Sequence, residues 1–127
     1  MRRSLLISLS AAAALLLGLT ACTGTASSGA GTIEVSTDTI IIDVRTPAEY
    51  SSGHLDGAQL IDFSGGEVAE AIPHLDPDAE YFVYCRSGNR SGQAIALMEQ
   101  AGFTNLTNLG SLQQAADATG LPVVTGG

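Results

Sequence analysis

Residues 81–100, YFVYCRSGNRSGQAIALMEQ, join an apolar run to a helical pattern through a short polar loop. The run Tyr81–Tyr84 is aromatic and β-branched, which is typical of a buried strand. From Ser91 onward apolar residues recur at helical spacing, and this pattern predicts a helix over 91–100 that is closed by Gly102. The stretch therefore predicts a strand, a loop over 85–90 and a helix, with a cysteine at the carboxyl end of the strand.

Apolar runs and helix signals alternate on both sides of this unit. Further strands are expected over 39–44, 58–63 and 103–109. Further helices are expected after residues 46 and 64 and over 112–119, the last of them broken by Gly120. Strictly alternating strands and helices predict an α/β fold with three layers, in which helices flank both faces of a mostly parallel central sheet.

Two of these helices carry the same start signal, Ser or Thr followed three residues later by Glu. Thr46 and Glu49 form the first capping box, with proline at position 47 and Gly53 as the stop. Ser64 and Glu67 repeat the pattern, and this second helix is expected to stop at residue 73, a proline.

The N-terminal segment is typical of an export signal. Two arginines precede an uncharged, mostly apolar run over 5–19, which is shorter than the roughly 20 residues of a spanning helix. The run ends in Leu19-Thr20-Ala21-Cys22, which resembles the lipobox of bacterial lipoproteins. We therefore expect a signal peptide over 1–21, a lipidated Cys22 with a Gly/Ser/Thr/Ala tether to residue 32, and a folded domain over 33–127. An ordinary secretory signal with an incidental Cys22 is the alternative.

This reading places the domain outside the cytoplasm, held on a bacterial membrane by its lipid. If Cys22 carries the lipid, Cys85 is the one free thiol, and a dithiol oxidoreductase is excluded because it needs a resolving cysteine.

The charge balance excludes some partners. The chain has 13 acidic residues against five arginines and no lysine, for a net charge of −8. Nucleic-acid binding and attachment to a membrane through a basic surface both need many cations, so we expect neither. Beyond the N-terminal pair, the arginines are Arg45, Arg86 and Arg90, and all three lie in motifs expected around Cys85.

Cys85 stands where ligands bind in parallel sheets, at the carboxyl end of a strand. Small residues in the loop let successive N–H groups turn inward at a helix N-terminus and form an anion nest. Such a field lowers the pKa of a thiol. The alternative is a buried cysteine that acts only as a small hydrophobic residue.

Three motifs in order closely resemble a single-domain rhodanese. They are Ile42-Asp43-Val44-Arg45 followed by Glu49-Tyr50, then Gly53-His54-Leu55 followed by Gly57-Ala58, and then Val83-Tyr84-Cys85-Arg86-Ser87-Gly88-Asn89-Arg90-Ser91. The resemblance extends from about residue 40 to residue 122. It implies a rhodanese-like α/β fold and sulfurtransferase activity without a metal or organic cofactor.

The resemblance also implies a mechanism. The Cys85 thiolate would take the outer sulfur of thiosulfate or a similar small anion, and a thiol or cyanide would then remove it from the persulfide. The N–H groups of residues 86–91, Gly88 and Ser91 included, would hold the persulfide. Arg86 is the candidate for binding the anionic end of the donor.

The remaining loop residues have open roles. Arg90 either faces the substrate or, as we favour, ties the loop to a carboxylate. The Ser87 and Asn89 side chains either donate hydrogen bonds to the substrate or only permit the turn.

Three further charged residues are expected to support the loop rather than take part in the chemistry. Asp43 is expected to pair with a loop arginine, and Arg45 with Glu49, four residues on. His54 is expected to make a structural hydrogen bond that shapes the turn into the next strand.

The sequence departs from the rhodanese pattern near its end, and other functions share the fold. Gly110-Ser111 replaces a glycine pair and the chain has no tryptophan, although Gly120-Leu121-Pro122 is kept.

Related phosphatases and arsenate reductases have one more residue between cysteine and arginine than the four found here. A non-catalytic domain that binds a persulfide or a partner protein is the second alternative.

Overall fold

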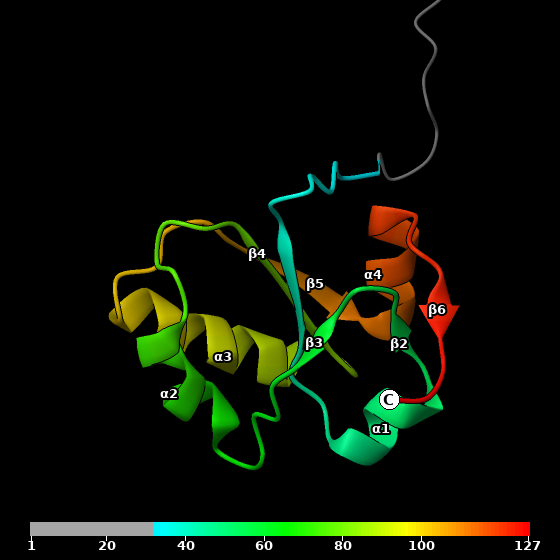
Figure 1. Cartoon of the computed structure of the whole chain (residues 1–127), viewed down its shortest axis with the longest axis horizontal. Coiled ribbons are helices and arrows are strands. Elements are labelled where there is room, and N and C mark those ends of the chain that lie inside the picture. Colours follow the sequence, from blue (N-terminus) through cyan, green and yellow to red (C-terminus); the bar gives the residue numbers. More distant parts are fainter. Residues whose placement is uncertain (1–31) are drawn as a thin grey trace, which may run out of the picture.

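The computed structural model describes residues 32–127. Its main sheet has four parallel strands in the order β3-β1-β4-β5, and a separate antiparallel pair joins β2 to β6. Figure 1 shows this arrangement. The strands are β1 (Ile40–Asp43), β2 (His54–Leu55), β3 (Gln59–Leu60), β4 (Tyr81–Cys85), β5 (Leu106–Ser111) and β6 (Val123–Val124). The helices are α1 (Pro47–Ser52), α2 (Glu67–Ala71), the 3₁₀ turn η1 (Ile72–His74), α3 (Asn89–Gln100) and α4 (Leu112–Thr119).

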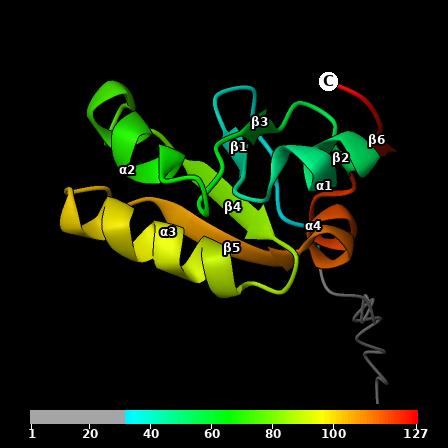
Figure 2. The same cartoon turned by 90° about the horizontal axis from the view of Figure 1, so that it is seen from below.

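The sheet lies between two layers of helices, which confirms the predicted α/β architecture. Figure 2 shows α2 and α3 together on one side, with α1 and α4 on the other. Alternate residues of β4 point to opposite layers, so Val83 packs with Met98 of α3, and Phe82 packs with Ala115 of α4. Every residue of β4 is buried, as expected for a central parallel strand that is covered on both faces.

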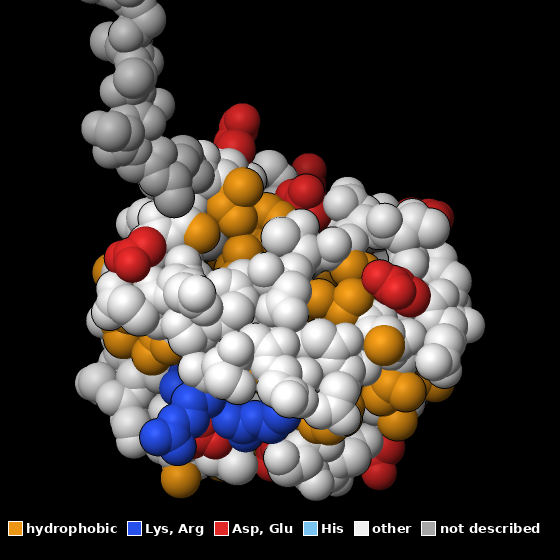
Figure 3. All heavy atoms as spheres, turned by 180° about the vertical axis from the view of Figure 1, so that it is seen from behind, with side chains coloured by type: hydrophobic (Ala, Val, Ile, Leu, Met, Phe, Trp, Pro, Cys, Tyr) orange, Lys and Arg blue, Asp and Glu red, His pale blue; other side chains and the backbone are white. Residues whose placement is uncertain are grey.

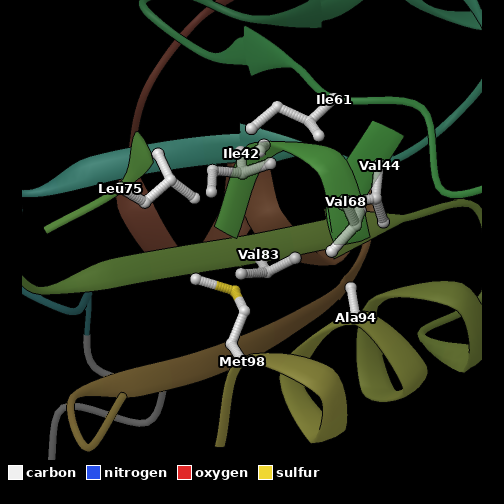
Figure 4. Close-up of a pocket in the computed structure, with 9 residues that line it drawn as sticks. Ile42, Val44, Ile61, Val68, Leu75, Val83, Ala94 and Met98 are labelled. Atoms are coloured by element: carbon white, nitrogen blue, oxygen red, sulfur yellow. The ribbon is translucent and has the colours of Figure 1, made fainter. Parts of the chain in front are cut away.

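The α2–α3 side of the sheet contains a small apolar cavity. Figure 4 shows its lining, in which Ile42, Val68, Val83 and Met98 face one another. Its volume is about 10 Å³, which is at the lower limit for a single water molecule. This cavity is therefore a packing defect of the core rather than a ligand site.

Local signals predicted some helix ends and missed others. Thr46 and Glu49 form the expected capping box of α1, and Gly53 is its C-cap. The second predicted box is wrong. Gly66, at φ +80°, precedes α2 without a side-chain cap, and the Glu67 carboxylate instead accepts the Asp62 N–H at 2.8 Å.

Several predicted bounds also change. Only Gln59–Leu60 of the apolar run 58–63 forms a strand, and the last parallel strand is 106–111 rather than 103–109. Proline 73 lies within η1 instead of ending the second helix directly. The β2–β6 pair was not predicted, because its two-residue strands lie far apart in the sequence.

Within residues 32–127, no helix is long and apolar enough to cross a membrane. The predicted signal peptide, the lipidation at Cys22 and most of the tether lie outside the described residues.

Candidate active site

Cys85 is the last residue of β4, and α3 begins four residues later at Asn89. The strand thus includes the cysteine, and the helix starts two residues earlier than the sequence pattern predicts. Gly88 makes this tight connection possible. Its φ is +89°, and a Cβ there would lie 3.3 Å from the Cα of Gly110 in β5. Only glycine fits this position without strain.

The Cys85 sulfur is fully buried and accepts hydrogen bonds from the loop. The Gly88 N–H lies 2.9 Å from Sγ, and the Ser91 hydroxyl lies 3.4 Å from it. Burial by itself raises the pKa of the thiol. Hydrogen bonds from the Ser91 side chain and from backbone N–H groups of the loop outweigh that effect, so the pKa of Cys85 is lowered overall. The geometry therefore favours a thiolate at the N-terminus of α3.

Arg90 ties this loop to α1, as predicted. Its guanidinium makes two hydrogen bonds of 3.0 Å each to the two carboxylate oxygens of Glu49. The bond from Arg90 is the main reason that the pKa of Glu49 falls to about 2. Glu49 also accepts from Thr46 in the capping box, so one carboxylate both starts α1 and fixes the first turn of α3.

The predicted partners of Asp43 and Arg45 are wrong. The two residues pair with each other, through Arg45 Nε to Asp43 Oδ1 at 2.9 Å and Arg45 Nη2 to Asp43 Oδ2 at 2.7 Å. The Arg45 backbone N–H also donates to Asp43 Oδ1, so the side chain of Arg45 turns back to Asp43 instead of pairing with Glu49. There it contacts the Gly53 carbonyl and lies 5.5 Å from the Tyr84 ring centre.

Arg86 is the exposed cation of the loop. Arg45 and Arg90 both have carboxylate partners, whereas within residues 32–127 no ion pair involves Arg86. On the face drawn in Figure 3, arginine side chains form one patch, and the other charged side chains in view are acidic. Arg86 directly follows Cys85 in the chain, and its side chain is exposed.

The other loop side chains differ in placement. Ser91 reaches the sulfur, as described above. The Asn89 side chain instead accepts a hydrogen bond from Gln93 at 2.6 Å, one turn along α3. This bond favours the interpretation that Asn89 stabilises the start of the helix. Ser87 is exposed and contributes its backbone N–H toward the sulfur.

His54 lies in β2 and makes a structural contact, as predicted. Its Nδ1 is 2.8 Å from the Tyr50 carbonyl oxygen, and its ring stacks on that of Tyr50 with centres 3.6 Å apart. This arrangement holds the end of α1 against β2.

The sequence pattern did not indicate Asn108 as a site residue. It lies in β5, next to a bulge where Val83 pairs with Asn108 and Tyr84 pairs with Gly110. Its side chain contacts both Gly88 and Ser91 of the loop. The available signal was weak, since asparagine is unfavourable inside a strand and bulges often re-aim side chains near active sites.

The chemistry available here is that of a buried thiol whose pKa is lowered by hydrogen bonds from its loop. Backbone N–H groups and the Ser91 hydroxyl donate hydrogen bonds to the sulfur, and the next residue, Arg86, is exposed. In the described part of the chain, no three His, Cys, Asp or Glu side chains are grouped so that they could hold a metal ion. The arrangement suits a covalent intermediate that carries negative charge on sulfur.

Comparisons with known proteins agree with this geometry. The rhodanese-like domain family matches residues 31–116. Thiosulfate sulfurtransferase PspE of Escherichia coli (strain K12) is 39% identical over 77 residues, which cover 59% of this chain and 72% of that protein. The probable adenylyltransferase/sulfurtransferase MoeZ of Mycobacterium tuberculosis is 41% identical over 69 residues, which cover 54% of this chain but only 18% of that longer protein.

A solved structure described as rhodanese with anions from E. coli has the same fold. It aligns with a TM-score of 0.61 and 36% identity, and the alignment covers 69% of this chain and 99% of that one. The Alr3790 protein from Anabaena sp. aligns with a TM-score of 0.62 and 27% identity over 72% of this chain and 80% of that one.

Proposed function

Because this chain belongs to the rhodanese-like family of sulfurtransferases, we propose that it transfers sulfane sulfur through a persulfide on Cys85. The observation that carries this proposal is the buried Cys85 sulfur, held by the Gly88 N–H at 2.9 Å and by the Ser91 hydroxyl. A persulfide anion has its charge on the outer sulfur, and the same loop can stabilise it.

In the first step the Cys85 thiolate attacks the outer sulfur of thiosulfate. An S–S bond forms to Sγ, the S–S bond of thiosulfate breaks, and its electron pair leaves on sulfite. In the second step cyanide or a thiolate attacks the outer sulfur of the persulfide, and the Cys85 thiolate is restored. Arg86 binds the anionic end of the donor, because it is exposed and directly follows Cys85 in the chain.

Sulfur transfer is tested with the protein, thiosulfate and cyanide, with thiocyanate as the product to follow. Intact mass after incubation with the donor alone is expected to rise by one sulfur in the wild type and to stay unchanged in Cys85→Ser. Arg86→Ala is expected to raise KM for thiosulfate more than it lowers kcat, with Asn105→Ala as a control far from the loop. A wild type that gains no sulfur from any sulfane donor contradicts the proposal.

The same experiment separates the alternatives. A persulfide that forms but is not turned over by cyanide or thiols supports a non-catalytic persulfide-binding domain. Hydrolysis of an aryl phosphate without any sulfur gain supports a phosphatase, for which four residues between Cys85 and Arg90 are one too few.

We propose also that Cys22 is lipidated and anchors the domain on the outer side of a bacterial membrane. The support is the Leu19-Thr20-Ala21-Cys22 stretch after a charged start and an apolar run. Fractionation of cells that express the full chain is expected to find it with membranes and to find Cys22→Ser in the soluble extracytoplasmic fraction. Unchanged membrane attachment of the variant contradicts the anchor.

A further inference from the structure

The Asn108 side chain bridges two residues of the loop that surrounds Cys85. Its Nδ2 donates to the Gly88 carbonyl at 3.0 Å, and its Oδ1 accepts from the Ser91 hydroxyl at 2.8 Å. Gly88 and Ser91 are also the residues whose N–H and hydroxyl contact the sulfur. Asn108 therefore contacts the loop at the two points from which the loop holds Cys85.

Ser91 has two possible acceptors for one hydrogen. A hydroxyl donates a single hydrogen, and Ser91 Oγ lies 2.8 Å from Asn108 Oδ1 and 3.4 Å from Cys85 Sγ. With a neutral thiol, the amide oxygen is the better acceptor. With a thiolate or persulfide anion, a charge-assisted bond to sulfur is stronger.

Asn108 can release this hydrogen without leaving a buried group unpaired. Its Oδ1 also accepts the Gly110 N–H at 2.9 Å, so it keeps one donor after Ser91 turns to the sulfur. Asn108 is also exposed at the edge of an open groove beside Ser87 and Gly88, where water can replace the lost partner.

We propose that Asn108 is a positioning residue for Cys85: it fixes Gly88 and holds the Ser91 hydrogen until the sulfur becomes anionic. This inference rests on the proposed role of Cys85 as the nucleophile. Residue 108 then determines how strongly Ser91 stabilises the anionic sulfur, because it competes with the sulfur for the same hydrogen.

The competition predicts a graded result. Ser91→Ala removes the hydroxyl, and in the wild type it is expected to raise the apparent pKa of Cys85 by about one unit, the lower end of the value of one hydrogen bond to a charged group, because Asn108 competes for the hydrogen. The rise is expected to be larger in Asn108→Ala, where no amide competes for the hydrogen. It is expected to be smaller in Asn108→Asp, where a carboxylate retains the hydrogen.

The apparent pKa is measured in the full chain as the pH dependence of Cys85 alkylation by iodoacetamide. Each comparison is between two proteins that have the same residue 108 and differ only in Ser or Ala at position 91. Any effect of residue 108 on the pKa of Cys85 that does not involve Ser91 is therefore the same in both and cancels. Asn105→Asp is the matched control, because it adds the same charge at the residue directly before β5. It is expected to leave the effect of Ser91→Ala unchanged.

An equal effect of Ser91→Ala with Asn, Ala or Asp at position 108 overturns the inference. If the aspartate variant does not fold, the alanine series alone makes the comparison. Alkylation needs only the thiol and no sulfur donor. A protein that takes up no sulfur would therefore contradict the proposed function but would leave the alkylation comparison intact. An equal effect of Ser91→Ala in all three backgrounds would overturn the role of Asn108 but would leave the proposed sulfur transfer intact.

Discussion

The ion pair between Glu49 and Arg90 gives a pH dependence of stability that can be worked out from the structure. Glu49→Gln removes the charge but keeps a side-chain oxygen that can accept from Thr46, so the capping box of α1 remains. What is lost is the bidentate contact to Arg90 at 3.0 Å, which links α1 to the first turn of α3.

The pKa of Glu49 falls from an ordinary value of 4.5 to about 2, with the hydrogen bond from Arg90 as the main cause. A shift of this size corresponds to at most about 3 kcal/mol at neutral pH. Both side chains are about a quarter exposed, at 23% and 28%, and solvent screening reduces the value. We expect Glu49→Gln to lower the free energy of unfolding by about 1 to 2 kcal/mol at neutral pH.

Because the folded-state pKa is lowered, the stabilisation is present above the unfolded-state pKa and is lost as pH falls through the folded-state pKa. Urea unfolding followed by circular dichroism is expected to show the two proteins converging between about pH 5 and pH 2. Glu99→Gln, at an exposed position on α3, is the control and is expected to stay within about 0.5 kcal/mol of the wild type. A Glu49→Gln deficit that is as large near pH 2 as at neutral pH refutes this reasoning.

Three further results are expected. The lowered pKa of Cys85 predicts that iodoacetamide alkylation of the wild type reaches its plateau at lower pH than for a free cysteine; a plateau at the same pH or higher would falsify the account of the loop. Gly88→Ala forces a side chain into a backbone with φ +89° and toward Gly110. It is expected to lower the free energy of unfolding by about 1 to 3 kcal/mol and to slow sulfur uptake, with Gly102→Ala as a control for positive φ in open space. Asp43→Asn leaves the Arg45 charge buried without its partner and is expected to cost about 3 to 5 kcal/mol in urea unfolding; a loss below about 1 kcal/mol would contradict the buried pair.

Local sequence signals were sufficient where neighbouring residues decide the structure. The capping box at Thr46 and Glu49 starts α1, and the buried run Tyr81–Tyr84 forms the central strand. The loop after it could be placed because glycine and small residues allow a tight turn into a helix. The second capping box failed because the segment after β3 forms a turn closed by Gly66, in which Ser64 is exposed.

Charge pairing was predicted less well, because it depends on side-chain direction. Spacing of four residues suggested that Arg45 pairs with Glu49, but Arg45 precedes the helix and turns back to Asp43. Glu49 is then free for Arg90, which is 41 residues away in sequence. The tie between Arg90 and a carboxylate was predicted, whereas the identity of that carboxylate depends on how the sheet places the start of α1 near the start of α3.

Contacts between distant segments could not be read from the sequence pattern. Asn108 reaches the loop because β5 pairs with β4 and a bulge follows it. The β2–β6 pair joins residues about seventy positions apart through strands of only two residues each. Neither the Asn108 contacts nor the β2–β6 pair produces a repeating pattern of apolar residues, so neither could be predicted from a single sequence.

The most direct test of sulfur transfer is the mass of the protein after incubation with thiosulfate and removal of the excess donor. We predict that the wild type gains one sulfur, that cyanide removes it with release of thiocyanate, and that Cys85→Ser gains none. A wild type of unchanged mass, or a Cys85→Ser variant that gains the same sulfur, would contradict the assignment of Cys85 as the sulfur carrier.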